Sequence, residues 1–153
     1  MQNLEEIKST LLIQIMDQLD EKIDSLSIEI ASTIESRNND TKSSAGDKFE
    51  TGREMMQIEL DKNEAQLNKT VKNKHDLSQI NTMCTFTKVE FGSLVITNMG
   101  KYFISLPIGK VEVDGDSIYC ISLASPLGQA MMHKYEKESF SFQNKEHMIE
   151  FIL

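Results

Sequence analysis

Side chains that could support acid–base, nucleophilic or metal chemistry are few in this sequence and do not form a familiar pattern. The three histidines, His75, His133 and His147, lack the spacing of metal ligands. Cys84 and Cys120 are too few for a disulfide framework or a metal site. There is no Ser-His-Asp order, glycine-rich phosphate loop or Cys-x-x-Cys pair. We therefore expect no catalytic centre, no metal site in the free protein and no cofactor.

Charged and polar residues are most concentrated in the segment 36–46 and just after it. This stretch reads Ser-Arg-Asn-Asn-Asp-Thr-Lys-Ser-Ser-Ala-Gly, and its carboxylate Asp40 is followed by Asp47 and Glu50. Asn, Asp, Ser and Gly are typical of turns and helix caps. The simplest interpretation is a solvated loop in which Ser44 or Asp47 caps the next helix.

Glycine and proline divide the chain into two parts with different expected structure. Residues 1–45 and 53–91 contain neither, whereas both prolines and five of the seven glycines lie at or after Gly92. Both residue types are disfavoured inside helices. The pattern predicts two long helices with a break between them, followed by a region of strands and turns.

Apolar residues recur every three or four positions in both predicted helices, as on one face of an α-helix. For residues 3–36 they are Leu4, Ile7, Leu11, Leu12, Ile15, Leu19, Ile23, Leu26, Ile30 and Ile34. For residues 47–74 they are Phe49, Met56, Leu60, Leu67 and Val71, with Asn63 in the same seam. The short connection predicts an antiparallel coiled coil over residues 1–76, a finger whose tip is residues 37–47.

Short β-rich segments follow, at 86–89, 93–97, 101–106, 110–113, 117–122, 139–142 and 147–152. Asp114-Gly115 marks a hairpin turn, and Ser125-Pro126 is a typical start of a short helix. We expect residues 77–153 to form an antiparallel sheet with one short helix against it. The predicted fold class is therefore α+β.

The net charge of −8 argues against free nucleic acid as the main partner, because phosphate binding needs clustered Lys and Arg. No apolar run approaches the length that spans a bilayer, and no signal peptide is visible. We expect a cytoplasmic protein without membrane association that is a monomer.

Three stretches resemble the Gre family of transcript-cleavage factors. Residues 47–54 look like the start of the family's second finger helix, where an aromatic residue precedes a basic and an acidic one. Residues 121–130 are similar to its C-terminal motif, in which a strand ends in a Ser-Pro-aliphatic turn and a helix begins. The final strand, 148–152, also matches. The segment Ser125-Pro126-Leu127-Gly128 is the best match.

The resemblance implies a transcription elongation factor that binds core RNA polymerase and is not itself an enzyme. The finger would enter the secondary channel, and the C-terminal domain, FKBP-like in fold, would dock on the channel rim through Ser125, Pro126, Leu127 and Gly128. Tip carboxylates would help the polymerase hold a second Mg²⁺ and orient water, near the 3′ end of the nascent RNA in backtracked complexes. Such Mg²⁺ ions need only one or two protein carboxylates.

The tip departs from the family pattern. An ungapped match on Phe49 places Lys42 and Ala45 where the family has two acids, and neither can bind Mg²⁺. Asp40, Asp47 and Glu50 are the carboxylates left to replace them. A factor that stimulates cleavage and a regulator that only occupies the channel therefore both remain open.

Two further hypotheses come from other classes of protein. The C-terminal domain of an FKBP-like fold could be a prolyl isomerase, but residues 77–153 have few aromatics for such a cleft. The stronger apolar stripe of the first helix would also suit an adaptor that dimerises through its coiled coil.

Overall fold

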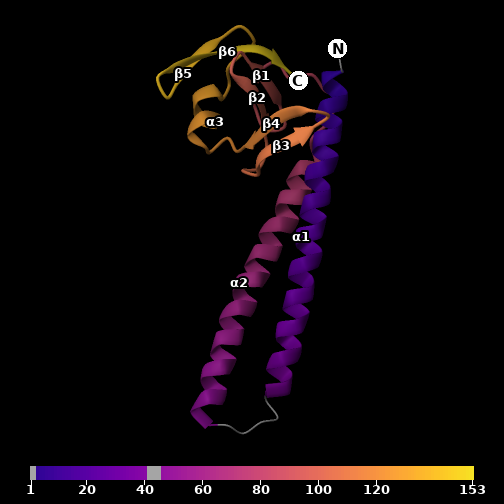
Figure 1. Cartoon of the computed structure of the whole chain (residues 1–153), viewed down its shortest axis with the longest axis vertical. Coiled ribbons are helices and arrows are strands. Elements are labelled where there is room, and N and C mark those ends of the chain that lie inside the picture. Colours follow the sequence, from indigo (N-terminus) through magenta and orange to yellow (C-terminus); the bar gives the residue numbers. More distant parts are fainter. Residues whose placement is uncertain (1–2, 41–45) are drawn as a thin grey trace. The chain divides into compact units, whose positions relative to one another are not determined.

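The computed structural model describes residues 3–40 and 46–153 (Figure 1). They form the helices α1 (Leu4–Asp40) and α2 (Gly46–Ser78), followed by six strands and a short helix, α3 (Pro126–Met131). The predicted α+β class is confirmed. The chain divides into two compact units, a hairpin unit of Ile15–Asp76 and a sheet unit of Met1–Gln14 with Leu77–Leu153.

Helix α1 buries the face that the sequence predicts. Every apolar position of the predicted stripe is buried or half-buried, and within the hairpin unit Ile15, Leu19 and Leu26 are almost fully covered. Both predicted helices extend further than expected, because α1 continues to Asp40 and α2 to Ser78. Burial of one face at this spacing is what stabilises so long a helix in water.

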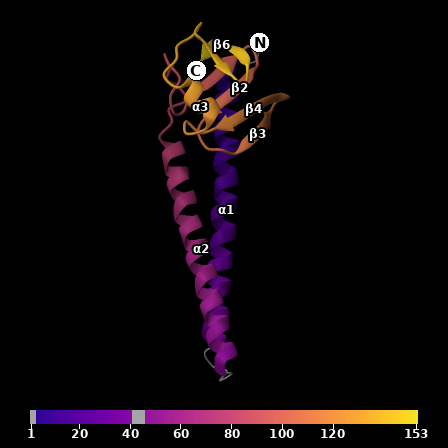
Figure 2. The ribbon, with the colours of Figure 1, turned by 90° about the vertical axis from the view of Figure 1, so that its left-hand side faces the viewer.

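Two polar contacts fix α1 and α2 as antiparallel neighbours. Arg37 Nη1 donates to Gln57 Oε1 at 2.9 Å, and Lys74 forms an ion pair with Asp20. In both pairs the residue numbers add to 94, as an antiparallel pair without a register slip requires. Figures 1 and 2 show the two helices running side by side in opposite directions.

The seam of α2 is only partly as predicted. Leu60 and Asn63 are buried, and Met56 and Leu67 are half-buried, but Val71 is 48% exposed. Thr70 is buried in its place, with its hydroxyl donating to Gln66 O at 2.8 Å. That internal bond removes most of the cost of burying the threonine hydroxyl. The prediction for Val71 is wrong, and the Phe49 side chain lies outside the described part of the chain.

The sheet unit contains six strands in the order β3-β4-β2-β1-β6-β5. The strands are β1 (Leu94–Thr97), β2 (Gly100–Ile104), β3 (Gly109–Val113), β4 (Asp116–Ile121), β5 (Ser139–Phe142) and β6 (Lys145–Ile152). All neighbouring pairs are antiparallel except β2 and β4, which are parallel. The prediction of a fully antiparallel sheet is wrong for β2 and β4. Edge strand β3 reverses the chain, so that β4 returns beside β2 in the same direction.

The predicted strand at 86–89 is also wrong. Only Lys88 takes part in pairing there, through one isolated bridge to Tyr135. The predicted Asp114-Gly115 turn is confirmed, with φ values of 50° and 88°. On one face of the sheet, Val95, Ile104 and Ile149 form a core with Met131 of α3.

The first turns of α1 belong to the sheet unit, although the predicted division placed residues 1–76 together. Ile7 and Leu11 are 2% and 0% exposed. Lys8 is also buried, and its Nζ donates to Leu153 O at 2.9 Å. Apolar burial and this bond join the helix start to the sheet unit. Among residues 3–40 and 46–153, no helix is long and apolar enough to cross a membrane.

Candidate functional site

The tip of the hairpin is shorter than predicted. Residues 37–40 continue α1, and α2 begins at Gly46, so only residues 41–45 connect the helices. Lys42, Ser44 and Ala45 therefore lie outside the described residues, as do the side chains of Asp40 and Asp47. The predicted capping role of Ser44 or Asp47 remains a prediction.

The three predicted tip carboxylates are spread over both helix ends. Asp40 is the last residue of α1, Asp47 is the second residue of α2, and Glu50 follows about one turn later with an exposed side chain. Because α1 and α2 are antiparallel neighbours, their backbones bring Asp40 and Asp47 to the same end of the hairpin unit.

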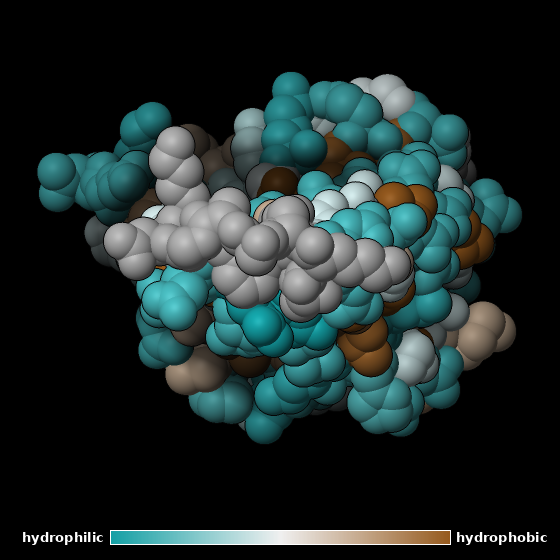
Figure 3. Space-filling view, turned by 90° about the horizontal axis from the view of Figure 1, so that it is seen from below, coloured by the Kyte–Doolittle hydropathy of each residue, from teal (hydrophilic) through white to brown (hydrophobic). Residues whose placement is uncertain are grey.

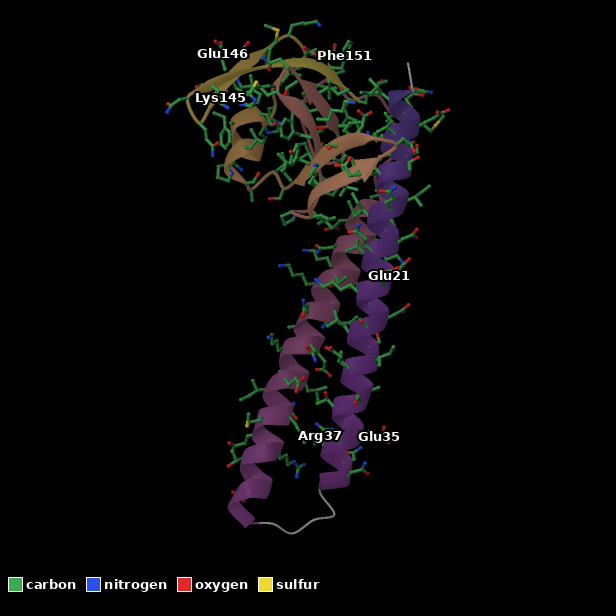
Figure 4. The ribbon with its side chains drawn as sticks, viewed as in Figure 1. Glu21, Glu35, Arg37, Lys145, Glu146 and Phe151 are labelled. Carbon is green, nitrogen blue, oxygen red and sulfur yellow. The ribbon has the colours of Figure 1, made fainter. Side chains whose placement is uncertain are left out.

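A polar bridge holds the helices together just before the tip. Arg37 donates to Gln57, and Gln57 Nε2 donates to Asp61 Oδ1 at 2.9 Å. In Figure 4 Arg37 lies on the side of α1 that faces α2. Its guanidinium therefore takes part in a contact between the two helices. Across the described residues, no group of three or more His, Cys, Asp or Glu side chains is placed to hold a metal ion.

The Ser125-Pro126-Leu127-Gly128 segment has a clear local folding role. The Ser125 hydroxyl accepts from Gly128 N at 3.0 Å and donates to Ser122 O at 2.7 Å, and Pro126 occupies the first turn of α3. Gly128 is buried, and a Cβ there would lie 2.2 Å from Ser122 O. Leu127 packs against the sheet core, so only Pro126 of the four is exposed. The predicted docking role of this segment stays a prediction.

Lys8 is a buried cation that the sequence reasoning did not single out. It is 1% exposed, and its Nζ lies 4.3 Å from the centroid of the Phe86 ring. Burial lowers the pKa of Lys8 from 10.5 to about 8, and the nearby Cys84 thiol opposes this shift. A lysine within a polar stretch gives no sequence signal of burial. Its contacts join the first turns of α1 to Phe86 and Leu153 within the sheet unit.

Among the described residues, the histidines and cysteines belong to no group of three or more side chains that could hold a metal ion. His147 is buried and stacks on Phe140 with ring centroids 4.9 Å apart, while His133 is exposed. Cys120 is buried in β4, and burial raises the pKa of its thiol to about 12. Cys84 is exposed. This arrangement supports structural roles for His147 and Cys120.

An apolar cleft of about 680 Å³ lies in the sheet unit beside the first turn of α1. Its walls include Leu4, Ile96 and Phe151, and its polar rim includes the 2.8 Å ion pair between Lys101 and Asp116. Phe151, labelled in Figure 4, is half exposed. On the face seen in Figure 3, apolar residues form separate spots on a mostly hydrophilic surface. The cleft offers room for an apolar group of a partner.

No family model matches this chain, and no curated protein matches its sequence. Among solved structures it is similar to one described as the transcription factor Gfh1, with 18% identity over 95% of this chain and 93% of that one. The TM-score of this match is 0.34. At that identity and TM-score, the likeness carries no argument about function.

Proposed function

We propose that this chain is a Gre-like transcription factor that binds core RNA polymerase and enters its secondary channel with the α1–α2 hairpin. The observation that carries the proposal is the antiparallel hairpin itself, with the Gre-like residues 47–54 at the start of its second helix. The Gre-like segment 125–128 supports it further, because Ser125 caps α3 as a Ser-Pro helix start requires.

The paired helices of the hairpin unit extend over a long stretch. From the Asp20–Lys74 ion pair to Asp40, α1 advances roughly 30 Å at 1.5 Å per residue. The pairing contacts at both ends of this stretch keep the two helices in one register.

In this proposal, the chain supplies carboxylates and the polymerase supplies the metal and the active site. Asp40, Asp47 and Glu50 are the candidate groups, since residues 42 and 45 of this chain are Lys and Ala. Occupancy of the channel requires none of these acids. Any transcript cleavage that the chain stimulates would depend on them, because Mg²⁺ requires oxygen ligands.

Binding is tested by co-purification of the full chain with core RNA polymerase. We expect the complex to form and to be displaced by another factor that binds the secondary channel. Failure to bind, or binding that the competitor does not affect, would reject channel entry.

The role of the tip is tested on stalled, backtracked complexes by measuring shortening of the transcript. The variants are Asp40→Asn, Asp47→Asn and Glu50→Gln, and the matched control is Glu59→Gln, which removes an exposed carboxylate elsewhere on α2. If the wild-type chain stimulates shortening, we expect a tip variant to lose it and the control to keep it. If it binds without any shortening, the chain is a cleavage-inactive regulator.

A further inference from the structure

Helix α1 carries a row of exposed residues on the side away from its buried stripe. The row is Asp17, Glu21, Asp24, Ile28, Ala31 and Glu35, at alternating spacings of four and three. These spacings keep residues on one helix face. Figure 4 shows Glu21 and Glu35 on the side of α1 that faces away from α2. We call these six residues the acidic row, and it contains no basic side chain.

Helix α2 carries a matching exposed row with the opposite charge. It consists of Met55, Ile58, Lys62, Ala65, Lys69 and Lys72, again at alternating spacings of three and four. We call it the basic row, and it contains no acidic side chain. Within the described part of the chain, no ion pair involves a residue of either row.

Both rows also expose large apolar side chains. Ile28 is 70% exposed in the middle of the acidic row. Met55 and Ile58 are 66% and 67% exposed at one end of the basic row. Exposed apolar side chains on a charged helix face can pack against a second helix.

We propose that the acidic row of one chain packs against the basic row of a second copy, with the two helices antiparallel. In the register that pairs Glu21 with Lys72, Asp24 faces Lys69 and Ile28 faces Ala65. Because both rows keep the same alternation of three and four, this register continues without a slip to Glu35 opposite Ile58. Unlike charges then meet at one end of the contact, and Ile28 meets Ala65 at its centre.

The contact joins different faces of the two copies, so each copy keeps one free row. Such a heterologous contact allows a third copy to add in the same way. A contact between two single helices is small, which is typical of transient association. We therefore expect a monomer in dilute solution, in line with the sequence, and growth beyond the dimer as concentration rises. The proposal needs no polymerase and stands apart from the proposed function.

The test measures the mass of the full chain by sedimentation across a concentration series, at low and at physiological salt. The wild-type chain should associate as concentration rises, and more weakly at higher salt because salt screens exposed charges. In one variant the acidic row is reversed by Glu21→Lys with Asp24→Lys. In the other the basic row is reversed by Lys69→Glu with Lys72→Glu.

Each reversed variant alone should lose at least about tenfold in association constant, because like charges then face each other. An equimolar mixture of the two variants should recover association, since the reversed rows complement one another. The control Glu59→Lys with Glu64→Lys makes the same change in net charge as the acidic-row variant, but on α2 outside the basic row. It should not weaken association. Circular dichroism confirms that each variant keeps its helices.

Three results would overturn the proposal. They are a wild-type chain that stays monomeric throughout the series, a reversed variant that associates as the wild type does, and a mixture that fails to recover association. The recovery is decisive, because damage to folding in either variant could not produce it.

Discussion

The same substitution, Gly→Ala, is expected to lower stability at one helical glycine, Gly128, and to raise it at another, Gly52. At Gly128 of α3, a Cβ would lie 2.2 Å from Ser122 O and 3.0 Å from both Leu123 Cα and Ser125 Oγ. At Gly52 of α2, no atom of the described residues lies within 4 Å of the added Cβ. Neither glycine has a positive φ, so steric contact and helix propensity decide whether alanine raises or lowers the free energy of unfolding.

The cost at Gly128 follows from what would have to move. Ser122 O is held by the backbone N–H of Ser125 at 3.1 Å and by its hydroxyl at 2.7 Å. Overpacking costs about 1 to 3 kcal/mol, and each weakened hydrogen bond adds about 1 kcal/mol. Alanine recovers about 1 kcal/mol through its helix propensity. We expect Gly128→Ala to destabilise the sheet unit by about 2 to 4 kcal/mol.

Gly52→Ala should instead stabilise the hairpin unit by about 0.5 to 1 kcal/mol, because it adds helix propensity without a clash. Chemical denaturation measures both effects with two probes. All three tyrosines, Tyr102, Tyr119 and Tyr135, lie in the sheet unit, so their fluorescence follows that unit. Far-ultraviolet circular dichroism is dominated by α1 and α2. A Gly128→Ala variant as stable as the wild type would refute the packing of α3 described above.

Three other substitutions or treatments have definite expected outcomes. Because burial lowers the pKa of Lys8 from 10.5 to about 8, the unfolded chain binds this proton more tightly, and stability should rise with pH between about 8 and 10.5. Lys8→Met should abolish that rise and stabilise the chain at neutral pH by about 1 kcal/mol. Removing the buried charge releases a desolvation penalty of up to about 3 kcal/mol, but it also removes one hydrogen bond and one ring contact. Denaturation at a series of pH values measures both effects. An alkylating reagent should label exposed Cys84 in the folded chain and buried Cys120 only in denaturant, as mass spectrometry would show, and rapid native labelling of Cys120 would contradict its burial. Asn63→Leu should raise the melting temperature of the helices, because buried Asn63 Nδ2 has no hydrogen-bond partner among the described residues; an unchanged or lower value would mean that the amide is satisfied.

The helices could be predicted from sequence because their signal is local and periodic. The stripe of α1 depends on spacing alone, and all its positions are buried or half-buried. In α2 the apolar signal is weaker, and neighbouring residues Thr70 and Val71 compete for the seam. Val71 is the more hydrophobic, but the fixed register of the two helices places Thr70 inside. The hydropathy of the two residues therefore could not predict which of them faces α1.

Long-range features were beyond the sequence for a different reason. The parallel pairing of β2 with β4 depends on where β3 lies in the sheet, which no turn signal specifies. Burial of Lys8 depends on Leu153 and Phe86, which are far away in the chain. At the candidate site, the sequence identifies Ser125 as a helix cap because that signal lies within four residues.

The bond between Lys8 and Leu153 also bears on how the chain folds as it is synthesised. These residues are 145 positions apart, so the sheet unit cannot close until the last strand has been made. At a synthesis rate of about 5 to 20 residues per second, this delay is on the order of ten seconds. The contacts of the hairpin unit span far shorter separations and can form earlier. During that interval the apolar start of α1 has no sheet to cover it, and a nascent chain would expose it to chaperones.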